Sequence, residues 1–179
     1  LNFLLILLFK THQSQYLNRE AALIARRVAD EASDARATKF VAGSMGPTTK
    51  TISVTGGITF NDLAFSYYEQ AVGLIEGGVD VLLLETSQDL INVKAGLDGI
   101  DRAIAELDIQ VAVAVQGTIE PMGTLLAGQD AEAFYTSLAH RDLLWLGFNC
   151  ATGPEFMTDH IRTLSGISRF PVSCVPNAG

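Results

Sequence analysis

Five short apolar runs recur along this chain of 179 residues, and their spacing limits the folds that it can adopt. They begin near positions 39, 79, 110, 143 and 171, at intervals of about 30 to 40 residues. Between each pair lies a segment whose apolar residues recur every three or four positions, as in an amphipathic helix. This alternation is typical of βα units with parallel strands. No linker or low-complexity segment interrupts it, so we expect a single domain over residues 1–179.

The same spacing predicts the individual elements. Thr59, with Asp62 three residues later, and Asp130 are predicted helix N-caps. The predicted strands are 40–45, 79–86, 111–115, 143–148 and 171–175. The predicted helices cover 16–37, 59–77, 88–107 and 130–139, and a last one begins at Pro154. In the first helix we expect the inward stripe to be Leu17, Ala21, Ile24, Val28 and Ala32.

Two architectures suit such a pattern, an open doubly wound sheet and a (β/α)8 barrel. No strand is followed by GxGxxG or GxxxxGK[ST], so the nucleotide-binding open sheet loses its best support. A whole barrel needs about 250 residues, which would make this one incomplete. The barrel is favoured because polar residues stand at the carboxyl ends of four strands, where a barrel has its pocket: Glu85, Thr118, Asn149 and Asn177.

Composition narrows the possible partners and location. The net charge of −8 argues against nucleic acid or an anionic membrane as the main partner. Two cysteines cannot form a disulfide framework, and this favours a reducing, cytoplasmic setting. The apolar run over residues 1–9 is far shorter than the roughly 20 residues of a membrane-spanning helix. We expect residues 1–15 to be a non-native or degraded start.

The end of the fourth run carries the most reactive side chain. The strand over 143–148 is followed by Asn149 and Cys150, and Gly153-Pro154 opens the next helix. A cysteine at such a tip can be a metal ligand, a nucleophile or a small buried thiol. The nucleophile hypothesis lacks a histidine at any strand tip to serve as its base, because these residues lie on a loop or on helices: His12, His140 and His160. Cys174 lies in an apolar run and is expected to be core.

Several motifs, in order and with matching spacing, resemble the homocysteine-binding domain of cobalamin-dependent methionine synthase. The resemblance covers about residues 16–179, and the motifs are specific only when taken together. They are FVAGSMGPT (40–48), EGGVDVLLLET (76–86), GTI (117–119), TLLAGQ (124–129), EAFY (132–135), GFNCATGP (147–154) and PNAG (176–179).

The resemblance implies a partial TIM (β/α)8 barrel, with five to six βα units and with its first strand and C-terminal strand missing. It also implies zinc held by three cysteines. Cys150 stands in the first ligand position, and the adjacent pair would lie beyond Gly179. The methyl donor implied is methylcobalamin on another module, so the implied partners are homocysteine and the folate- and cobalamin-binding modules. With one thiolate the chain alone is expected to be inactive.

The resemblance also suggests roles for the residues at the strand ends. Glu85 is expected to pair with the substrate ammonium, since an amino acid in a dry pocket needs a compensating charge. Asn149 is expected to orient the loop that carries Cys150, and three weaker substrate-binding candidates are Thr118, Asn177 and Gly46. Two alternatives remain open. One is a methyltransferase that uses betaine or S-methylmethionine, and the other is a non-catalytic truncated barrel.

Overall fold

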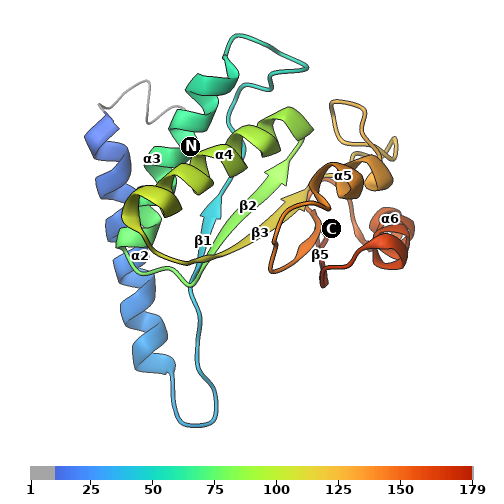
Figure 1. Ribbon diagram of the computed structural model, residues 1–179. Coiled ribbons are helices and arrows are strands. Elements are labelled where there is room, and N and C mark those ends of the chain that lie inside the picture. The colour runs from blue at the N-terminus through green and yellow to red at the C-terminus, as the bar shows by residue number, and fades with distance from the viewer. Residues whose placement is uncertain (1–10, 179) are drawn as a thin grey trace.

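The structure, a computed structural model, describes residues 11–178. The prediction for the first fifteen residues therefore falls largely outside the described range. Helices and strands alternate along the chain (Figure 1). The helices are α2 (Thr11–Ala32), α3 (Phe60–Glu76), α4 (Leu90–Leu107), α5 (Ala131–Leu138) and α6 (Pro154–Ile167). The strands are β1 (Ala42–Met45), β2 (Val81–Ser87), β3 (Ala112–Gly117), β4 (Leu146–Asn149) and β5 (Val172–Val175).

The strands form one parallel sheet in which every strand pairs with its neighbours in sequence. The order is β1-β2-β3-β4-β5, and every pairing is parallel. Right-handed crossovers between consecutive strands place the connecting helices on the same face of the sheet. A doubly wound sheet would instead reverse its strand order at a switch point. The topology is therefore that of a barrel wall, as the strand-end residues predicted.

The core lies between the sheet and the helices that cover it. Side chains alternate along each strand, and those pointing toward the helices are fully buried, among them Met45, Leu82 and Phe148. Leu84 packs directly against α4 at Gly96, where a Cβ atom would lie 2.7 Å from Leu84 Cδ2. Close helix–sheet packing therefore fixes the positions of the strands and of their ends.

The opposite face of the sheet is only partly covered. Ala42, Ser44 and Val175 are exposed there, and Leu83 is half-buried. Because the strands are parallel, their carboxyl ends lie at one edge of the sheet. The residues predicted from the strand tips are therefore expected to gather at this edge.

The predicted N-caps are confirmed. The hydroxyl of Thr59 accepts a hydrogen bond from the backbone N–H of Asp62 at 3.2 Å, and Asp130 caps α5 by accepting from the N–H of Ala133 at 2.8 Å. Boundaries differ more. β4 begins at Leu146, three positions after the predicted start, because Leu143 and the residue after it still connect α5 to the sheet.

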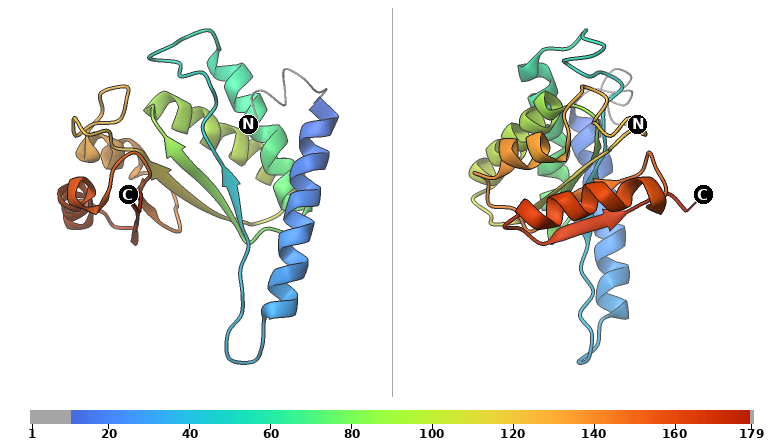
Figure 2. Two further views of the ribbon diagram at one scale, coloured as in Figure 1. Left: turned by 180° about the vertical axis from the view of Figure 1, so that it is seen from behind. Right: turned by 90° about the vertical axis from the view of Figure 1, so that its right-hand side faces the viewer.

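The predicted inward stripe of the first helix is wrong. Its larger members are exposed, with Ile24 at 57% and Val28 at 56%. α2 instead buries the face that carries Ala22 and Ala29, and it packs against α3 (Figure 2). A Cβ atom on Gly77, the residue that caps the C-terminus of α3, would lie 2.4 Å from the Cβ atom of Ala22. Glycine and alanine allow this close contact, and apolar periodicity does not reveal a face made of small residues.

Cys174 is also not in the core as predicted. It is exposed on β5, an edge strand of the sheet as described. Its sulfur lies 3.6 Å from the sulfur of Met157 on α6. The side chain therefore points to the helix side of the sheet, away from the less covered face.

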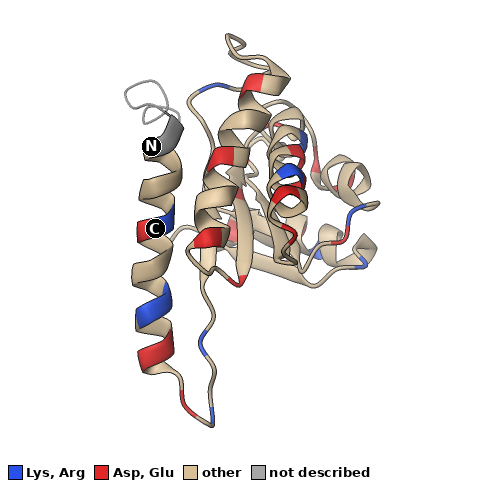
Figure 3. Cartoon of the chain, turned by 60° about the vertical axis from the view of Figure 1, so that its left-hand side comes forward, with Lys and Arg blue, Asp and Glu red and all other residues tan. Residues whose placement is uncertain are grey.

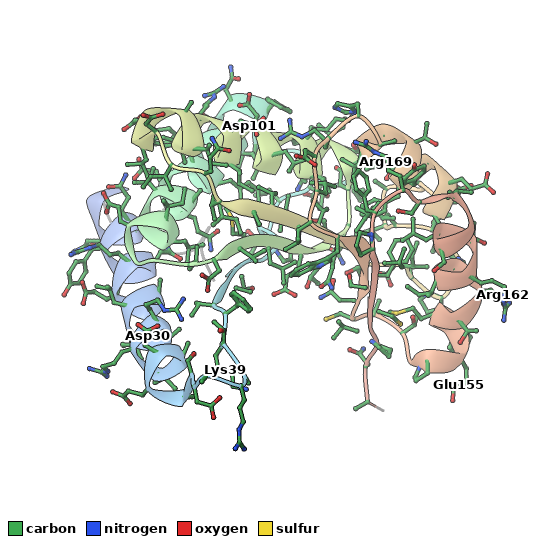
Figure 4. The ribbon with its side chains drawn as sticks, turned by 60° about the horizontal axis from the view of Figure 1, so that its bottom comes forward. Asp30, Lys39, Asp101, Glu155, Arg162 and Arg169 are labelled. Atoms are coloured by element: carbon green, nitrogen blue, oxygen red, sulfur yellow. The ribbon has the colours of Figure 1, made fainter. Side chains whose placement is uncertain are left out.

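Charged side chains are distributed over the helices and loops. Figure 3 shows acidic and basic residues interspersed along the helices, and Figure 4 shows labelled examples at the periphery, such as Lys39, Glu155 and Arg162. None of the helices within residues 11–178 combines the length and the hydropathy that crossing a membrane would require.

Candidate metal and substrate site

β2 has a bulge between Leu84 and Ser87, so that two consecutive residues of β2 lie opposite a single residue of β3. Leu84 pairs with Val115 and Ser87 with Gly117, so β2 advances three residues where β3 advances two. The extra residue falls at the end of the strand, where Thr86 has a φ of 58°. A positive φ is rare for a β-branched residue, and bulges redirect side chains near functional sites.

The end of β4 has a similar irregularity. Asn149 is its last residue, and Cys150 follows with a φ of 58°. The Cys150 backbone N–H donates to the carbonyl of Val175 at 3.0 Å, which ties this turn to β5. The Cys150 side chain is partly exposed. Its sulfur lies 3.2 Å from Asn149 Nδ2 and 3.9 Å from the hydroxyl of Thr86.

The Asn149 side chain connects the two strand ends. It is 3% exposed, and its Oδ1 accepts the backbone N–H of Thr86 at 2.9 Å. This bond fixes the orientation of the amide, because only the oxygen can accept. The nitrogen then faces Thr86 Oγ1 at 2.8 Å, Cys150 Sγ at 3.2 Å and Glu85 Oε2 at 3.4 Å. One buried amide therefore holds Glu85 and Cys150 near each other.

Glu85 has hydrogen-bond donors at both carboxylate oxygens. Ser44 on β1 donates to Oε1 at 2.5 Å, and Asn149 reaches Oε2. Ser44 is itself held by Gln70, whose Nε2 donates to the Ser44 carbonyl at 3.1 Å. Among the ion pairs found within residues 11–178, none includes Glu85. The carboxylate is thus oriented by neutral donors and can still pair with a cation.

The weaker candidates lie around this cluster. Thr118 is 2% exposed, and its hydroxyl donates to the Asn149 carbonyl at 3.0 Å. It therefore helps to fix the backbone of Asn149. Gly46 follows β1, and its carbonyl accepts from the Tyr67 hydroxyl at 3.2 Å. Asn177 follows β5 and donates its backbone N–H to the Thr152 carbonyl at 3.0 Å.

Glu85, Asn149 and Cys150 were expected from the sequence to lie at one edge of the sheet, and they do lie close together there. Ser44 and Thr86 were not among the residues predicted for the site. Ser44 lies inside a strand run, and only the register of β1 against β2 shows that it reaches Glu85. Thr86 directly follows Glu85 and would normally point to the other face. Its left-handed backbone conformation could not be read from the residue type.

The metal-binding capacity of these residues is limited. Over residues 11–178 no three His, Cys, Asp or Glu side chains are grouped so as to hold a metal ion. Cys150 is a partly exposed sulfur with polar neighbours, which suits one thiolate ligand. The described residues thus offer a single ligand, whereas a zinc site with catalytic function has three.

A sheet wound in one direction, with polar side chains gathered at the carboxyl ends of its strands, defines a protein of the (β/α) barrel class. The comparison with family models then gives the family itself. The homocysteine S-methyltransferase model matches residues 7–179, and the chain belongs to this family.

Relatives of known sequence are much longer than this chain. It is 40% identical over 163 residues to a methionine synthase of Mycobacterium leprae, which covers 91% of this chain and 13% of that protein. It is also 40% identical over 163 residues to a methionine synthase of Mycobacterium tuberculosis, covering 91% of this chain and 14% of that protein. The chain therefore spans a small part of the length of these relatives.

Solved structures confirm the fold. The apo form of the homocysteine methyltransferase MmuM from Escherichia coli superposes with a TM-score of 0.78 at 22% identity, over 96% of this chain and 62% of that chain. Its metallated form gives a TM-score of 0.78 at 20% identity, over 96% of this chain and 61% of that chain. The five described strands are thus part of a TIM barrel.

Proposed function

We propose that this chain is part of the homocysteine-binding domain of a cobalamin-dependent methionine synthase, which transfers a methyl group to homocysteine to give methionine. The observation that carries the proposal is that Asn149 holds Glu85 and Cys150 side by side at one end of the sheet. The identity of 40% to two methionine synthases supports it. Cytoplasmic location is part of this proposal.

Glu85 would bind the ammonium group of homocysteine. Both of its oxygens accept hydrogen bonds from neutral donors. None of the ion pairs found within residues 11–178 includes Glu85, so no positive side chain balances its charge there. Burying a substrate ammonium beside an anion avoids the cost of desolvating an unpaired charge. Ser44 and Asn149 would keep the carboxylate oriented while substrate enters.

Cys150 would supply one of three thiolate ligands to zinc. A free thiol has a pKa of about 8.5, and bound zinc lowers the pKa of a coordinated thiol, which keeps the substrate sulfur anionic and nucleophilic. Asn149 Nδ2, at 3.2 Å from the Cys150 sulfur, would stabilise the thiolate form of that side chain. The methyl donor in this proposal is methylcobalamin on another module, and the partners are the folate- and cobalamin-binding modules of the whole protein.

Serine variants of the two cysteines test the proposal in a chain extended to the length of the family domain. Cys150→Ser is expected to lose zinc and homocysteine methylation. Cys174→Ser is the matched control, since this exposed sulfur lies on the helix side of the sheet. Full zinc content and full activity in Cys150→Ser would show that Cys150 is not a ligand.

A zinc titration of the 179-residue chain tests the proposal that it supplies only one of the three zinc ligands. One thiolate is too few ligands for a stable site, so we expect no tight stoichiometric binding. Tight binding at one zinc per chain would overturn the assignment of the other two ligands to residues outside this chain. A betaine- or S-methylmethionine-dependent enzyme is the alternative for the donor. It predicts that the extended chain accepts methyl groups from these small molecules without cobalamin.

A further inference from the structure

We propose that Thr86 is a positioning residue that sets the place of the Cys150 sulfur through Asn149. The proposal rests on the proposed function in one respect, namely that Cys150 is a metal ligand. Its structural part rests only on the contacts at the ends of β2 and β4. Neither the sequence motifs nor the family assignment gives Thr86 a role of its own.

The backbone of Thr86 is held in an unfavourable conformation. Its φ of 58° costs an L-residue about 1 to 2 kcal/mol, and more for a β-branched side chain. Such a conformation persists only where the surroundings fix it. Here the backbone N–H of Thr86 donates to Asn149 Oδ1 at 2.9 Å. The next carbonyl, that of Ser87, accepts the N–H of Thr118 at 2.9 Å.

The hydroxyl of Thr86 uses this conformation to reach the cluster. Its Oγ1 accepts from Asn149 Nδ2 at 2.8 Å. A hydroxyl has one hydrogen to donate, and the Cys150 sulfur lies 3.9 Å away as its acceptor. The sulfur therefore faces two donors from different strands, the Thr86 hydroxyl and the Asn149 amide.

These contacts form a closed set of bonds. The Thr86 backbone N–H donates to the oxygen of the Asn149 amide, and the Thr86 hydroxyl accepts from its nitrogen. That nitrogen and the Thr86 hydroxyl both face the Cys150 sulfur. Removing the hydroxyl leaves the buried amide nitrogen with weaker acceptors, while the bond from the Thr86 backbone N–H to Asn149 Oδ1 remains. The sulfur would then lose one donor directly, and the other donor would be held at one end of the amide only.

Thr86→Ala and Thr86→Ser separate the hydroxyl from the backbone strain. Both lack the β-branch, so neither has more steric strain than threonine at this φ, and only serine keeps the hydroxyl.

In the isotope-labelled 179-residue chain, NMR follows the exchange of the Asn149 side-chain amide protons with solvent. We expect exchange to be at least about 10-fold faster in Thr86→Ala, since a lost hydrogen bond is worth about 1.4 kcal/mol. Thr86→Ser should restore slow exchange. Thr136→Ala, at an exposed threonine of α5, is the matched control.

The second measurement is metal affinity in the chain extended to the family domain. Loss of a partner of a metal ligand typically weakens affinity about 10- to 100-fold, so Thr86→Ala should show such a loss and Thr86→Ser should recover it. Unchanged amide exchange in Thr86→Ala would overturn the proposal. So would equal amide exchange or equal metal affinity in the alanine and serine variants. If instead Cys150→Ser keeps full metal affinity, the proposed function fails while the amide-exchange result stands on its own.

Discussion

The side-chain nitrogen of Asn149 lies 2.8 Å from the hydroxyl oxygen of Thr86, although β3 separates their two strands in the sheet. This contact joins the ends of β2 and β4 through side chains and passes over the strand between them. The backbone ladder cannot make such a link, because it connects neighbouring strands only. Asn149 is therefore both a structural tie and the organiser of the candidate site.

Asn149→Asp should lower stability because it replaces the side-chain N–H donors of this residue with a carboxylate oxygen. That oxygen would face Glu85, so the substitution adds like-charge repulsion to the lost bonds. We expect the free energy of unfolding to fall by about 1 to 3 kcal/mol in urea denaturation at neutral pH. Asn61→Asp makes the same chemical change in the exposed first turn of α3, where a negative charge is favourable. Equal effects of the two substitutions would contradict the role given to Asn149.

Tyr68 should lose its hydroxyl proton only at an unusually high pH. Its hydroxyl donates to Glu106 Oε2 at 2.7 Å, and the hydrogen bond to this carboxylate, followed by burial, raises the pKa of Tyr68 to about 12. In Glu106→Gln the pKa should move back toward about 10, as measured by tyrosinate absorbance, with Glu132→Gln at an exposed site as control.

The effect of Tyr68 on stability has a defined sign. Its pKa is higher in the folded than in the unfolded chain, so the stabilisation is present below about pH 10 and is lost as the pH rises toward about 12. The stability difference between the natural chain and Glu106→Gln should therefore shrink across this range. A difference that stays constant would contradict the coupling.

Ala151→Gly should stabilise the protein. Ala151 is exposed with a φ of 52°, and glycine removes the cost of this conformation at some loss of chain entropy. The net gain expected is about 0.5 to 1 kcal/mol, measured by thermal or urea unfolding. Ala105→Gly, at an exposed position inside α4, should instead cost about 0.5 to 1 kcal/mol. A loss of stability at both positions would argue against the left-handed conformation.

Gly147→Ala should disrupt the pairing of β4 with β5. A Cβ atom at this position would lie 2.1 Å from both the carbonyl oxygen and the hydroxyl of Ser173. Ser173 would have to move, and its bond from Gln116 Nε2 at 2.8 Å would be lost. We expect a destabilisation of about 1 to 3 kcal/mol. Gly166→Ala on α6, with open space around it, should be neutral or stabilising, and an equal loss there would contradict this account.

The sequence predicted the order of the elements because each strand run and each helix stripe is a local pattern. It also predicted that Glu85, Asn149 and Cys150 meet, since parallel strands bring their carboxyl ends to one edge. The exposed stripe of α2 was mispredicted because that helix packs through Ala22 against Gly77, and contact between small residues leaves no apolar signal. The conformations of Thr86 and Cys150 depend on register and on bonds from other strands, which no local pattern encodes.

The bulge at the end of β2 and the turn after β4 have a shared consequence. Regular pleating sends consecutive side chains to opposite faces, yet here Glu85 and Thr86 both reach the Asn149 amide, as does Cys150. Two strand tips thus deliver four groups to one place. Deleting a single residue from either tip would return one of each pair to the far side of the sheet. At these two strand ends the number of residues therefore matters as well as their identity.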